Sequence, residues 1–390
     1  MKIDLLYELQ MPRPWTGPSA ESDCFWQAIE QIKLADAVGF DTVWAVEHHF
    51  QSEYSHSSAP EVFLGAVSQV TTDIRLGHGV VLLPPPFNHP IRVAERVATL
   101  DILSRGRVEF GVGRSAMGEQ QGFGIEAEHS KAMMLEALAA IPKMWTSEVF
   151  SWDGTWFQVP ERAIVPKPVQ RPHPPIWQAA TSPDSWELAG RNQVGALGLT
   201  ILLPLEQMKE HIANYWRAYE AGAPIGASGN GQVRIFTLVH CAETTQRAID
   251  QGGNDAAMLY IDYVLNRLLR DEIALERAGV PGVRPYSQFL DRYDYLRSVA
   301  SGEEGAELFD TQNMIITGDP DRCIEKLEAY ERVGADGVVC MMQSGRIAHE
   351  DVMRSIELFG RHVIPHFKGR ATAAARRRAQ LDPAISPSAR

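Results

Sequence analysis

The sequence has little of what marks several protein classes. Its 390 residues include 4 cysteines, at positions 24, 241, 323 and 340, and none of them forms a CxxC pair. A disulfide scaffold and a zinc site are therefore not indicated, and a reducing, cytoplasmic location is expected. No stretch approaches the roughly 18 apolar residues of a membrane helix, and the segment after Met1 lacks the apolar core of a signal peptide.

Positive charge is also in short supply. The 37 Lys and Arg residues face 49 Asp and Glu residues, which gives a net charge of −12 and a pI near 5.5. This balance disfavours nucleic acid or an anionic membrane as a partner. The chain has no Walker loop, no GxGxxG after its first predicted strand and no GxSxG elbow, so P-loop, Rossmann-type and serine-hydrolase chemistry are not indicated.

What the sequence does contain is an alternation of short apolar runs with segments of helical spacing, which is typical of βα units around a parallel sheet. Most of the runs lack polar alternation, as expected for strands covered on both faces. Eight strands are predicted, and they indicate a closed (β/α)8 barrel of the TIM type: 3–6, 42–46, 74–81, 108–112, 176–179, 195–199, 235–240 and 338–341.

Two stretches near the ends of the chain share the pattern Val-Gly-x-Asp-x-Val, at 38–43 and 333–338. Each joins a predicted helix to a predicted strand, and its glycine suits a left-handed helix C-cap. The helix before the second copy begins with Asp319-Pro320, a capping side chain followed by proline at the first helical position. The two stretches are therefore interpreted as equivalent joints, with chance resemblance as the alternative.

Three segments exceed a minimal barrel. Residues 149–159 read as a hairpin around Asp153-Gly154, and residues 242–311 as a long helical insertion after strand seven. After Lys368 the composition cannot bury a core, so residues 1–367 are predicted to form the barrel and 368–390 a disordered basic tail. A nucleic-acid-binding arm is the alternative for the tail, and the acidic body disfavours it.

Reactive groups in a parallel barrel gather at the carboxyl ends of the strands. Strand two ends in Glu47-His48-His49-Phe50, which places titratable side chains at the mouth, where an imidazole can move a proton or donate a hydrogen bond. The alternative is a histidine pair satisfied by backbone carbonyls. A metal site is disfavoured, because adjacent strand residues point opposite ways and no third ligand has a comparable placement.

The next three strand ends favour a flat ring and a phosphate. Strand three ends in Gly77-His78-Gly79-Val80, and its two glycines lack the Cβ atoms that would keep a flat ring from the backbone. Arg114 follows strand four, and Thr181 and Ser182 follow strand five, where a helix is predicted to begin near Ser182. Each feature taken by itself also has a purely structural explanation: a bend for the glycines, a surface ion pair for Arg114, and a helix cap for Thr181 and Ser182. Two sites that favour an anion, at the ends of consecutive strands, are consistent with one phosphate group that contacts both.

These residues resemble the bacterial luciferase-like flavin monooxygenases over most of 1–240 and 312–366. The most specific stretches are Val46 to Phe50, Gly79 to Pro84 with Asn88 to Pro90, Arg92 to Glu95, Leu100-Asp101, Ser104 to Arg107 and Phe110 to Arg114. The resemblance implies an eight-stranded α/β barrel, usually a homodimer. It also implies reduced FMN as cofactor, delivered by a separate NAD(P)H-dependent flavin reductase, and O2 as co-substrate.

The resemblance assigns roles residue by residue. His48 corresponds to a base or hydrogen-bond partner beside the flavin, and Arg114 to an arginine that contacts the phosphate. The cofactor-binding turns match Gly79 and Val80, where members often have a cis peptide, and Ala180, Thr181 and Ser182. Bacterial luciferase has a cysteine where this chain has Gly113, so light emission is not implied.

The implied activity is a monooxygenase that oxygenates a small, mostly apolar organic substrate. The family's flavin hydroperoxide needs a dry pocket, and the 242–311 insertion is a candidate lid. Two alternatives remain open at this point. One is a deazaflavin-dependent oxidoreductase on the same fold, and the other is a non-catalytic flavin-binding relative. The residues do not name the substrate.

Overall fold

A closed parallel barrel forms the centre of the computed structural model, which describes residues 1–15, 17–201, 203–279, 293–294, 296, 303–375 and 377. Each strand pairs in parallel with the next, and the last pairs with the first. The predicted (β/α)8 barrel is confirmed. In order round the barrel, the strands are β1 (Lys2–Tyr7), β2 (Thr42–Ala45), β3 (Arg75–His78), β5 (Val108–Gly113), β8 (Ile176–Ala179), β9 (Gly195–Leu199), β10 (Val233–Cys241) and β12 (Gly337–Met341).

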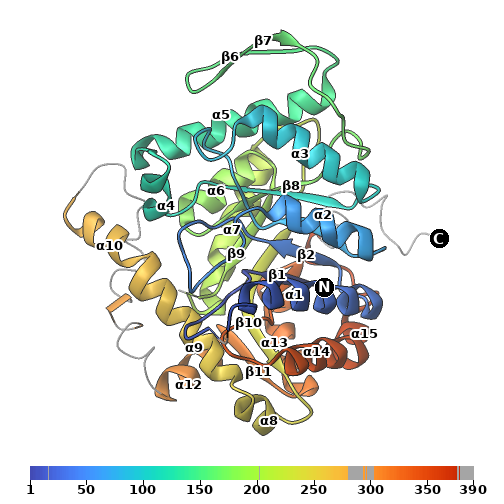
Figure 1. The fold of residues 1–390 in the computed structure, drawn as a ribbon, viewed down its shortest axis with the longest axis vertical. Helices are drawn as coiled ribbons and strands as arrows, with labels where there is room; N and C mark the ends of the chain where they lie inside the picture. The colour runs from blue at the N-terminus through green and yellow to red at the C-terminus, as the bar shows by residue number, and fades with distance from the viewer. Residues whose placement is uncertain are drawn as a thin grey trace.

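Helices surround these strands (Figure 1), and all nine residues of β10 are buried, as expected for a strand covered on both faces. No helix of the described residues is both long and apolar enough to cross a membrane. The surrounding helices are α1 (Ala20–Val38), α2 (Pro60–Val70), α3 (Pro90–Leu103), α4 (Met117–Gly122), α5 (Ala127–Thr146), α6 (Pro183–Arg191), α7 (Leu205–Ala221), α13 (Pro320–Val333), α14 (His349–Leu358), η2 (Phe359–Val363) and α15 (Ile364–Phe367).

Two strands differ from the prediction. A continuous strand over 74–81 is wrong, because the chain breaks its pairing at Gly79-Val80 and resumes as β4 (Val81–Leu82), which pairs with β5. The short strand β11 (Ile315–Gly318) was not predicted. It pairs with the carboxyl half of β10, beyond the residues of β10 that pair with β9.

The predicted joints and hairpin are confirmed. Gly39 and Gly334 cap α1 and α13 with positive φ angles of 98° and 102°, a conformation that glycine adopts without steric cost. The side chain of Asp319 accepts a hydrogen bond from the backbone N–H of Arg322 at the start of α13. The antiparallel hairpin of β6 (Phe150–Asp153) and β7 (Gln158–Arg162) projects beyond α5 at the top of Figure 1.

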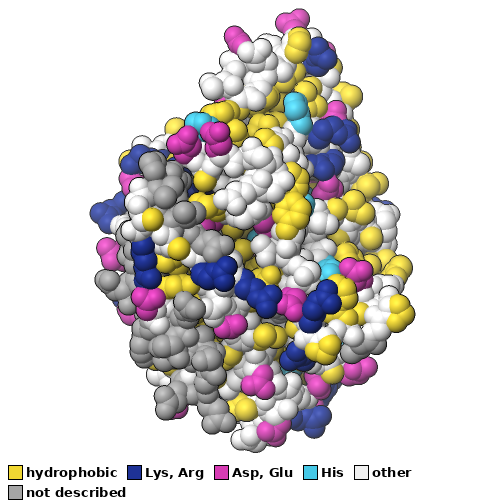
Figure 2. All heavy atoms as spheres, turned by 60° about the vertical axis from the view of Figure 1, so that its left-hand side comes forward, with side chains coloured by type: hydrophobic (Ala, Val, Ile, Leu, Met, Phe, Trp, Pro, Cys, Tyr) yellow, Lys and Arg dark blue, Asp and Glu magenta, His cyan; other side chains and the backbone are white. Residues whose placement is uncertain are grey.

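The 242–311 segment contains α8 (Thr245–Asp250), α9 (Gly253–Tyr263), η1 (Val264–Leu268), α10 (Arg270–Arg277) and α12 (Glu303–Thr311). Helices α9 and α10 run along the left side of Figure 1, and the face they occupy carries both basic and acidic side chains (Figure 2). The Tyr263 hydroxyl donates to Gln51 at 2.9 Å, and the Met117 N–H donates to Glu272, so the segment is tied to loops of the barrel.

Parts of two predicted segments lie outside the described residues: 280–292, 295 and 297–302 of the insertion, and 376 and 378–390 of the tail. Within the described part of the tail, Ala374 is buried. Its N–H donates to the side chain of Asp336 at the joint before β12. The first residues after Lys368 therefore pack against the barrel.

A buried polar network crosses the lower part of the barrel. The Asp4 carboxylate on β1 accepts hydrogen bonds from Arg234 Nε on β10 at 3.0 Å and from Trp44 Nε1 on β2 at 3.1 Å. The Arg234 guanidinium lies 5.2 Å from the ring centre of Trp177, whose Nε1 donates to Glu109 at 2.6 Å. Burial raises the pKa of Asp4 to about 6, although Arg234 opposes the rise.

Arg234→Met is expected to lower the free energy of unfolding by about 3–5 kcal/mol, because it leaves the Asp4 carboxyl buried without its cation. The loss should be larger at about pH 8 than at about pH 5, since a protonated Asp4 needs no cation. Urea denaturation at the two pH values measures both effects. Arg92→Met is the matched control, because the Arg92 side chain is 66% exposed on α3. Equal losses in the two variants would contradict the role of the ion pair.

Candidate active site

A cavity of about 310 Å³ opens at the carboxyl ends of the barrel strands. Six of the seven predicted site residues line it: His48, Gly79, Val80, Arg114, Thr181 and Ser182. Ala180 is buried and is not among the lining residues. The structure thus brings together groups that follow four consecutive strands of the barrel, β2, β3, β5 and β8.

His48 is held between two carboxylates. Its Nδ1 lies 2.9 Å from Glu119 Oε1 on α4, and its Nε2 lies 4.0 Å from Glu8 Oε2, which follows β1. Burial alone would lower the pKa of His48, but the charges of Glu119 and Glu8 outweigh it and raise the pKa to about 9. At neutral pH the imidazole is therefore a cation that can donate a hydrogen bond into the cavity.

The two neighbours of His48 support the backbone. The Glu47 carboxylate accepts hydrogen bonds from the Leu82 N–H at 2.9 Å and from Asn88 Nδ2 at 2.7 Å, which ties the strand-two end to the segment after β4. The ring of His49 stacks on Phe87 with 6.0 Å between centroids. His48 and His49 thus have different surroundings, and the cavity receives His48.

The predicted phosphate-binding groups lie at one end of the cavity. Arg114 and Thr181 follow the adjacent strands β5 and β8, and Arg114 donates to Ser130 on α5 at 2.6 Å. Lys131, the next residue of α5, also lines the cavity. Helix α6 begins after Ser182, as predicted, and Ser182, Asp184 and Ser185 at its N-terminal end line the cavity. Asp184 in its first turn adds one negative charge there.

The peptide bond between Gly79 and Val80 is cis, as the resemblance implies. Val80 explains the departure at Gly113, because a Cβ at residue 113 would lie 2.4 Å from Val80 Cγ2. A cysteine at this position would require Val80 to move. The glycine in place of the luciferase cysteine is therefore part of how this chain shapes the cavity wall.

The sequence analysis did not identify several polar residues that line the cavity or contact a residue that lines it, namely Glu8, Tyr54, Glu119, Lys131, Gln178 and Tyr260. Glu8 immediately follows β1, so the strand-end rule would have found it had it been applied to strand one. Buried Oε1 of Gln178 has no hydrogen-bond partner among the described residues, and it offers an acceptor to a ligand. Burial raises the pKa values of Tyr54 and Tyr260, so both hydroxyls stay protonated.

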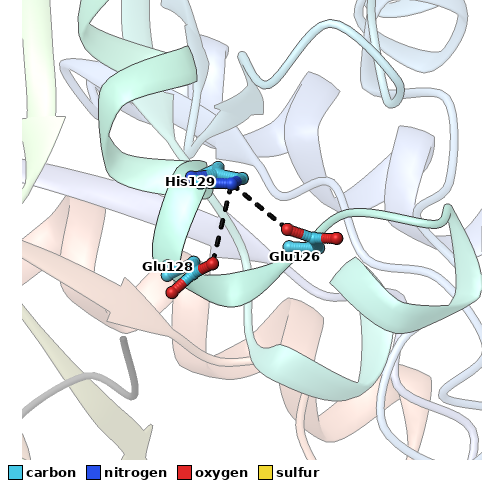
Figure 3. A group of neighbouring side chains, drawn as sticks. All are labelled: Glu126, Glu128 and His129. Atoms are coloured by element: carbon cyan, nitrogen blue, oxygen red, sulfur yellow. Dashed lines mark ion pairs between the residues drawn. The ribbon is translucent and has the colours of Figure 1, made fainter. Parts of the chain in front are cut away.

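Glu126, Glu128 and His129 at the start of α5 also lie close together (Figure 3). His129 Nε2 is 3.1 Å from Glu126 and 3.6 Å from Glu128. The three side chains are 42–72% exposed. Exposed acidic groups of this kind are common without a metal, so we assign none to them.

Comparison with known proteins gives one family. Its sequence model, described as luciferase-like monooxygenase, matches residues 9–337. The oxygenase component of a flavin-dependent trigonelline monooxygenase from Acinetobacter baylyi is 26% identical over 87% of this chain and 89% of that protein. Limonene 1,2-monooxygenase from Rhodococcus erythropolis is 28% identical over 91% and 85%.

Solved structures share the fold. Monooxygenase RslO1 from Streptomyces bottropensis has a TM-score of 0.74 and 26% identity, covering 94% of this chain and 100% of its own. The oxygenating constituent of 3,6-diketocamphane monooxygenase from Pseudomonas putida, in complex with FMN, has a TM-score of 0.67 at 22% identity over 94% and 98%. A coenzyme F420 dependent tetrahydromethanopterin reductase from Methanopyrus kandleri has a TM-score of 0.63 at 20% identity over 94% and 99%.

The electrostatic position of His48 predicts its titration. An NMR titration of the imidazole should give a pKa of about 9, and Glu119→Gln should lower it by roughly 1–3 units, because an adjacent negative charge is lost. Since the folded-state pKa exceeds the ordinary 6.5, protonation of His48 stabilises the fold fully below about pH 6.5, and this contribution disappears as the pH rises through about 9.

The His48 signal is identified among the 12 histidines by its loss in His48→Gln. Glu128→Gln is the matched control, because Glu128 pairs with His129 and should leave the His48 pKa unchanged. A wild-type midpoint near 6.5 would contradict the assigned environment.

Proposed function

Because this chain belongs to the luciferase-like monooxygenase family, we propose that it uses reduced FMN and O2 to oxygenate a small organic substrate. The observation that carries the proposal is the convergence of His48, the Gly79-Val80 turn, Arg114 and Thr181 on a single cavity. These are the positions at which the family resemblance places the flavin. Of the Glu-His-His-Phe motif, Glu47 and His48 line this cavity.

The donors at the β5 and β8 ends fit the phosphate of FMN. Arg114 and Lys131 supply positive charge, Thr181 supplies a hydroxyl, and the N-terminus of α6 supplies the positive end of its dipole. The open acceptor Oε1 of Gln178 fits an O–H or N–H of the same molecule. When bound, the reduced flavin supplies two electrons to O2, so that one oxygen atom enters the substrate and the other leaves as water.

His48 acts in this proposal as a donor. Glu119 holds its Nδ1 and keeps the ring protonated at neutral pH, which leaves Nε2–H to bind a negatively polarised oxygen in the cavity. A group that develops negative charge there would be stabilised by the imidazolium. The positive charge available to such an oxygen therefore comes from His48, which stays protonated up to about pH 9.

Water exclusion is the task proposed for the 242–311 segment. Val264, Leu268 and Leu269 of its helices line the cavity with apolar side chains. The hydrogen bond between Tyr263 and Gln51 and that between Met117 and Glu272 hold the segment over the mouth. We propose that it is the lid of this cavity, because these apolar side chains keep water away from it.

Reduced flavin has to come from elsewhere, and we propose an NAD(P)H-dependent reductase as partner. The support is the relative from Acinetobacter baylyi, which is the oxygenase component of a flavin-dependent trigonelline monooxygenase. We also propose a homodimer, which rests on the family resemblance alone. The second candidate function on this fold is hydride transfer with a deazaflavin. Its support is the structural neighbour that depends on coenzyme F420.

The proposed function predicts slow reoxidation. When the protein is mixed with reduced FMN and air, oxidised FMN and hydrogen peroxide should form more slowly than from free reduced FMN, because the closed cavity keeps water out. Stopped-flow absorbance and a peroxide assay measure the two products. The same experiment is repeated with reduced deazaflavin in place of reduced FMN. Reoxidation of FMN at the free rate, together with tight deazaflavin binding, would favour the second candidate.

Arg114→Gln is expected to weaken FMN binding by roughly 10- to 100-fold, because a charge-assisted contact to the phosphate is lost. Riboflavin, which lacks the phosphate, should bind both proteins equally. Fluorescence titration measures the two affinities, and Arg92→Gln on the exposed side of α3 is the matched control. An equal loss for FMN and riboflavin would show that Arg114 supports the fold and does not bind the phosphate.

A further inference from the structure

One carboxylate oxygen in the cavity lacks a donor. Glu8 is 3% exposed and lines the cavity directly after β1. Its Oε1 accepts a hydrogen bond from the Tyr260 hydroxyl at 3.0 Å. Its Oε2 has no hydrogen-bond partner among the described residues, since His48 Nε2 is 4.0 Å away. A buried acceptor left open costs free energy that a bound donor would recover.

The surroundings of Glu8 form a small polar spot in an apolar wall. The hydroxyls of Tyr54 and Tyr260 lie 2.6 Å apart, and the Tyr54 ring packs edge-on against His48. Phe236 packs against Tyr260, and Val264 follows on the same segment as Tyr260. A ligand at this spot would therefore contact mostly apolar atoms and one cluster of polar atoms.

The charge of the cluster favours a donor. Two carboxylates, Glu8 and Glu119, flank the single imidazolium of His48, which leaves the ionised cluster with an excess negative charge. The pKa of Glu8 is raised by burial and lowered by the charge of His48, with the first effect larger. Tyr54 and Tyr260 add hydroxyl dipoles, and neither brings a positive charge.

The cluster also lies apart from the phosphate-binding end. β8, which Thr181 follows, is four strands from β1 in either direction round the barrel. Glu8 and the phosphate-binding groups therefore stand on opposite sides of the mouth. A molecule anchored by its phosphate at β5 and β8 leaves the β1 side for a second ligand.

We propose that Glu8 determines substrate specificity, and that its Oε2 accepts a hydrogen bond from an O–H or N–H group on an otherwise apolar substrate. This inference rests on the proposed function, because it assigns the substrate side of the same cavity. It narrows the substrate class from apolar molecules in general to apolar molecules with one hydrogen-bond donor.

Four probes of equal ring size test the proposal: cyclohexanol, cyclohexylamine, cyclohexanone and methylcyclohexane. Ligand-detected NMR and calorimetry measure their binding to the wild-type protein with and without FMN. We expect cyclohexanol or cyclohexylamine to bind roughly 3- to 10-fold more tightly than the ketone and the hydrocarbon. The first two probes distinguish a neutral donor from a cationic one. Equal or undetectable binding of all four, or a preference for the ketone, would overturn the proposal.

Glu8→Gln removes the carboxylate charge and replaces one of its two acceptor oxygens with an NH2 donor, so the preference for donors should fall while methylcyclohexane binds as before. Glu161→Gln on the exposed hairpin strand β7 is the matched control. Tyr260→Phe keeps Glu8 and removes its neighbour's hydroxyl, so the preference should persist. Loss of the preference for donors in Tyr260→Phe would assign donor recognition to Tyr260 and overturn the role of Glu8. This measurement tests the proposal even if Glu8→Gln does not fold.

FMN titration of each protein separates the two proposals. Intact FMN binding without a donor preference would overturn the role of Glu8 alone. Failure of the wild-type protein to bind FMN would overturn the proposed function, whatever the probes show.

Discussion

The ion pair between Asp4 and Arg234 is the constraint on which the barrel interior depends. The two residues lie on β1 and β10, and β12 runs between these strands, so the pair spans a strand that contributes neither charge. The path crosses Gly337 of β12, where a Cβ would stand 2.8 Å from Arg234 Cδ. Removing two charges from water is costly, and the cost is offset only by close geometry and further hydrogen bonds. Trp44 supplies one of these bonds and Trp177 a ring face for the guanidinium.

The same network forms the floor of the candidate active-site cavity. Trp44 bonds to Asp4 with its Nε1, packs edge-on against Trp177 at 5.5 Å and lines the cavity above. Gly77 of β3 leaves room for its ring, since a Cβ there would lie 2.3 Å away. A rigid floor fixes the strands, and the strands fix where their carboxyl ends place His48, Arg114 and Thr181. The chemistry at the mouth is thus supported by the packing beneath it.

Local pattern was enough to predict the parts of the molecule that local physics determines. Strand runs, the caps at Gly39 and Gly334 and the hairpin at Asp153-Gly154 depend on neighbouring residues, and the structure contains them. The strand β11, which among the described strands pairs only with the carboxyl half of β10, was not predicted. Contacts such as Glu8 with Tyr260, which are 252 residues apart, depend on how distant helices dock, and no local pattern reports that. Glu119 escaped notice for the same reason, because only folding brings α4 against His48.

The opposite placement of the two ends of the cavity has an evolutionary consequence. The β5 and β8 ends carry the groups proposed to hold the phosphate, whereas the β1 end meets α9 of the 242–311 segment through Tyr260. Substitutions in one half need not disturb the other, because contacts that share no partners tend to act independently. With the proposed division of the cavity, descendants of this barrel can change their substrate by altering one loop and one strand end while the proposed cofactor site stays the same.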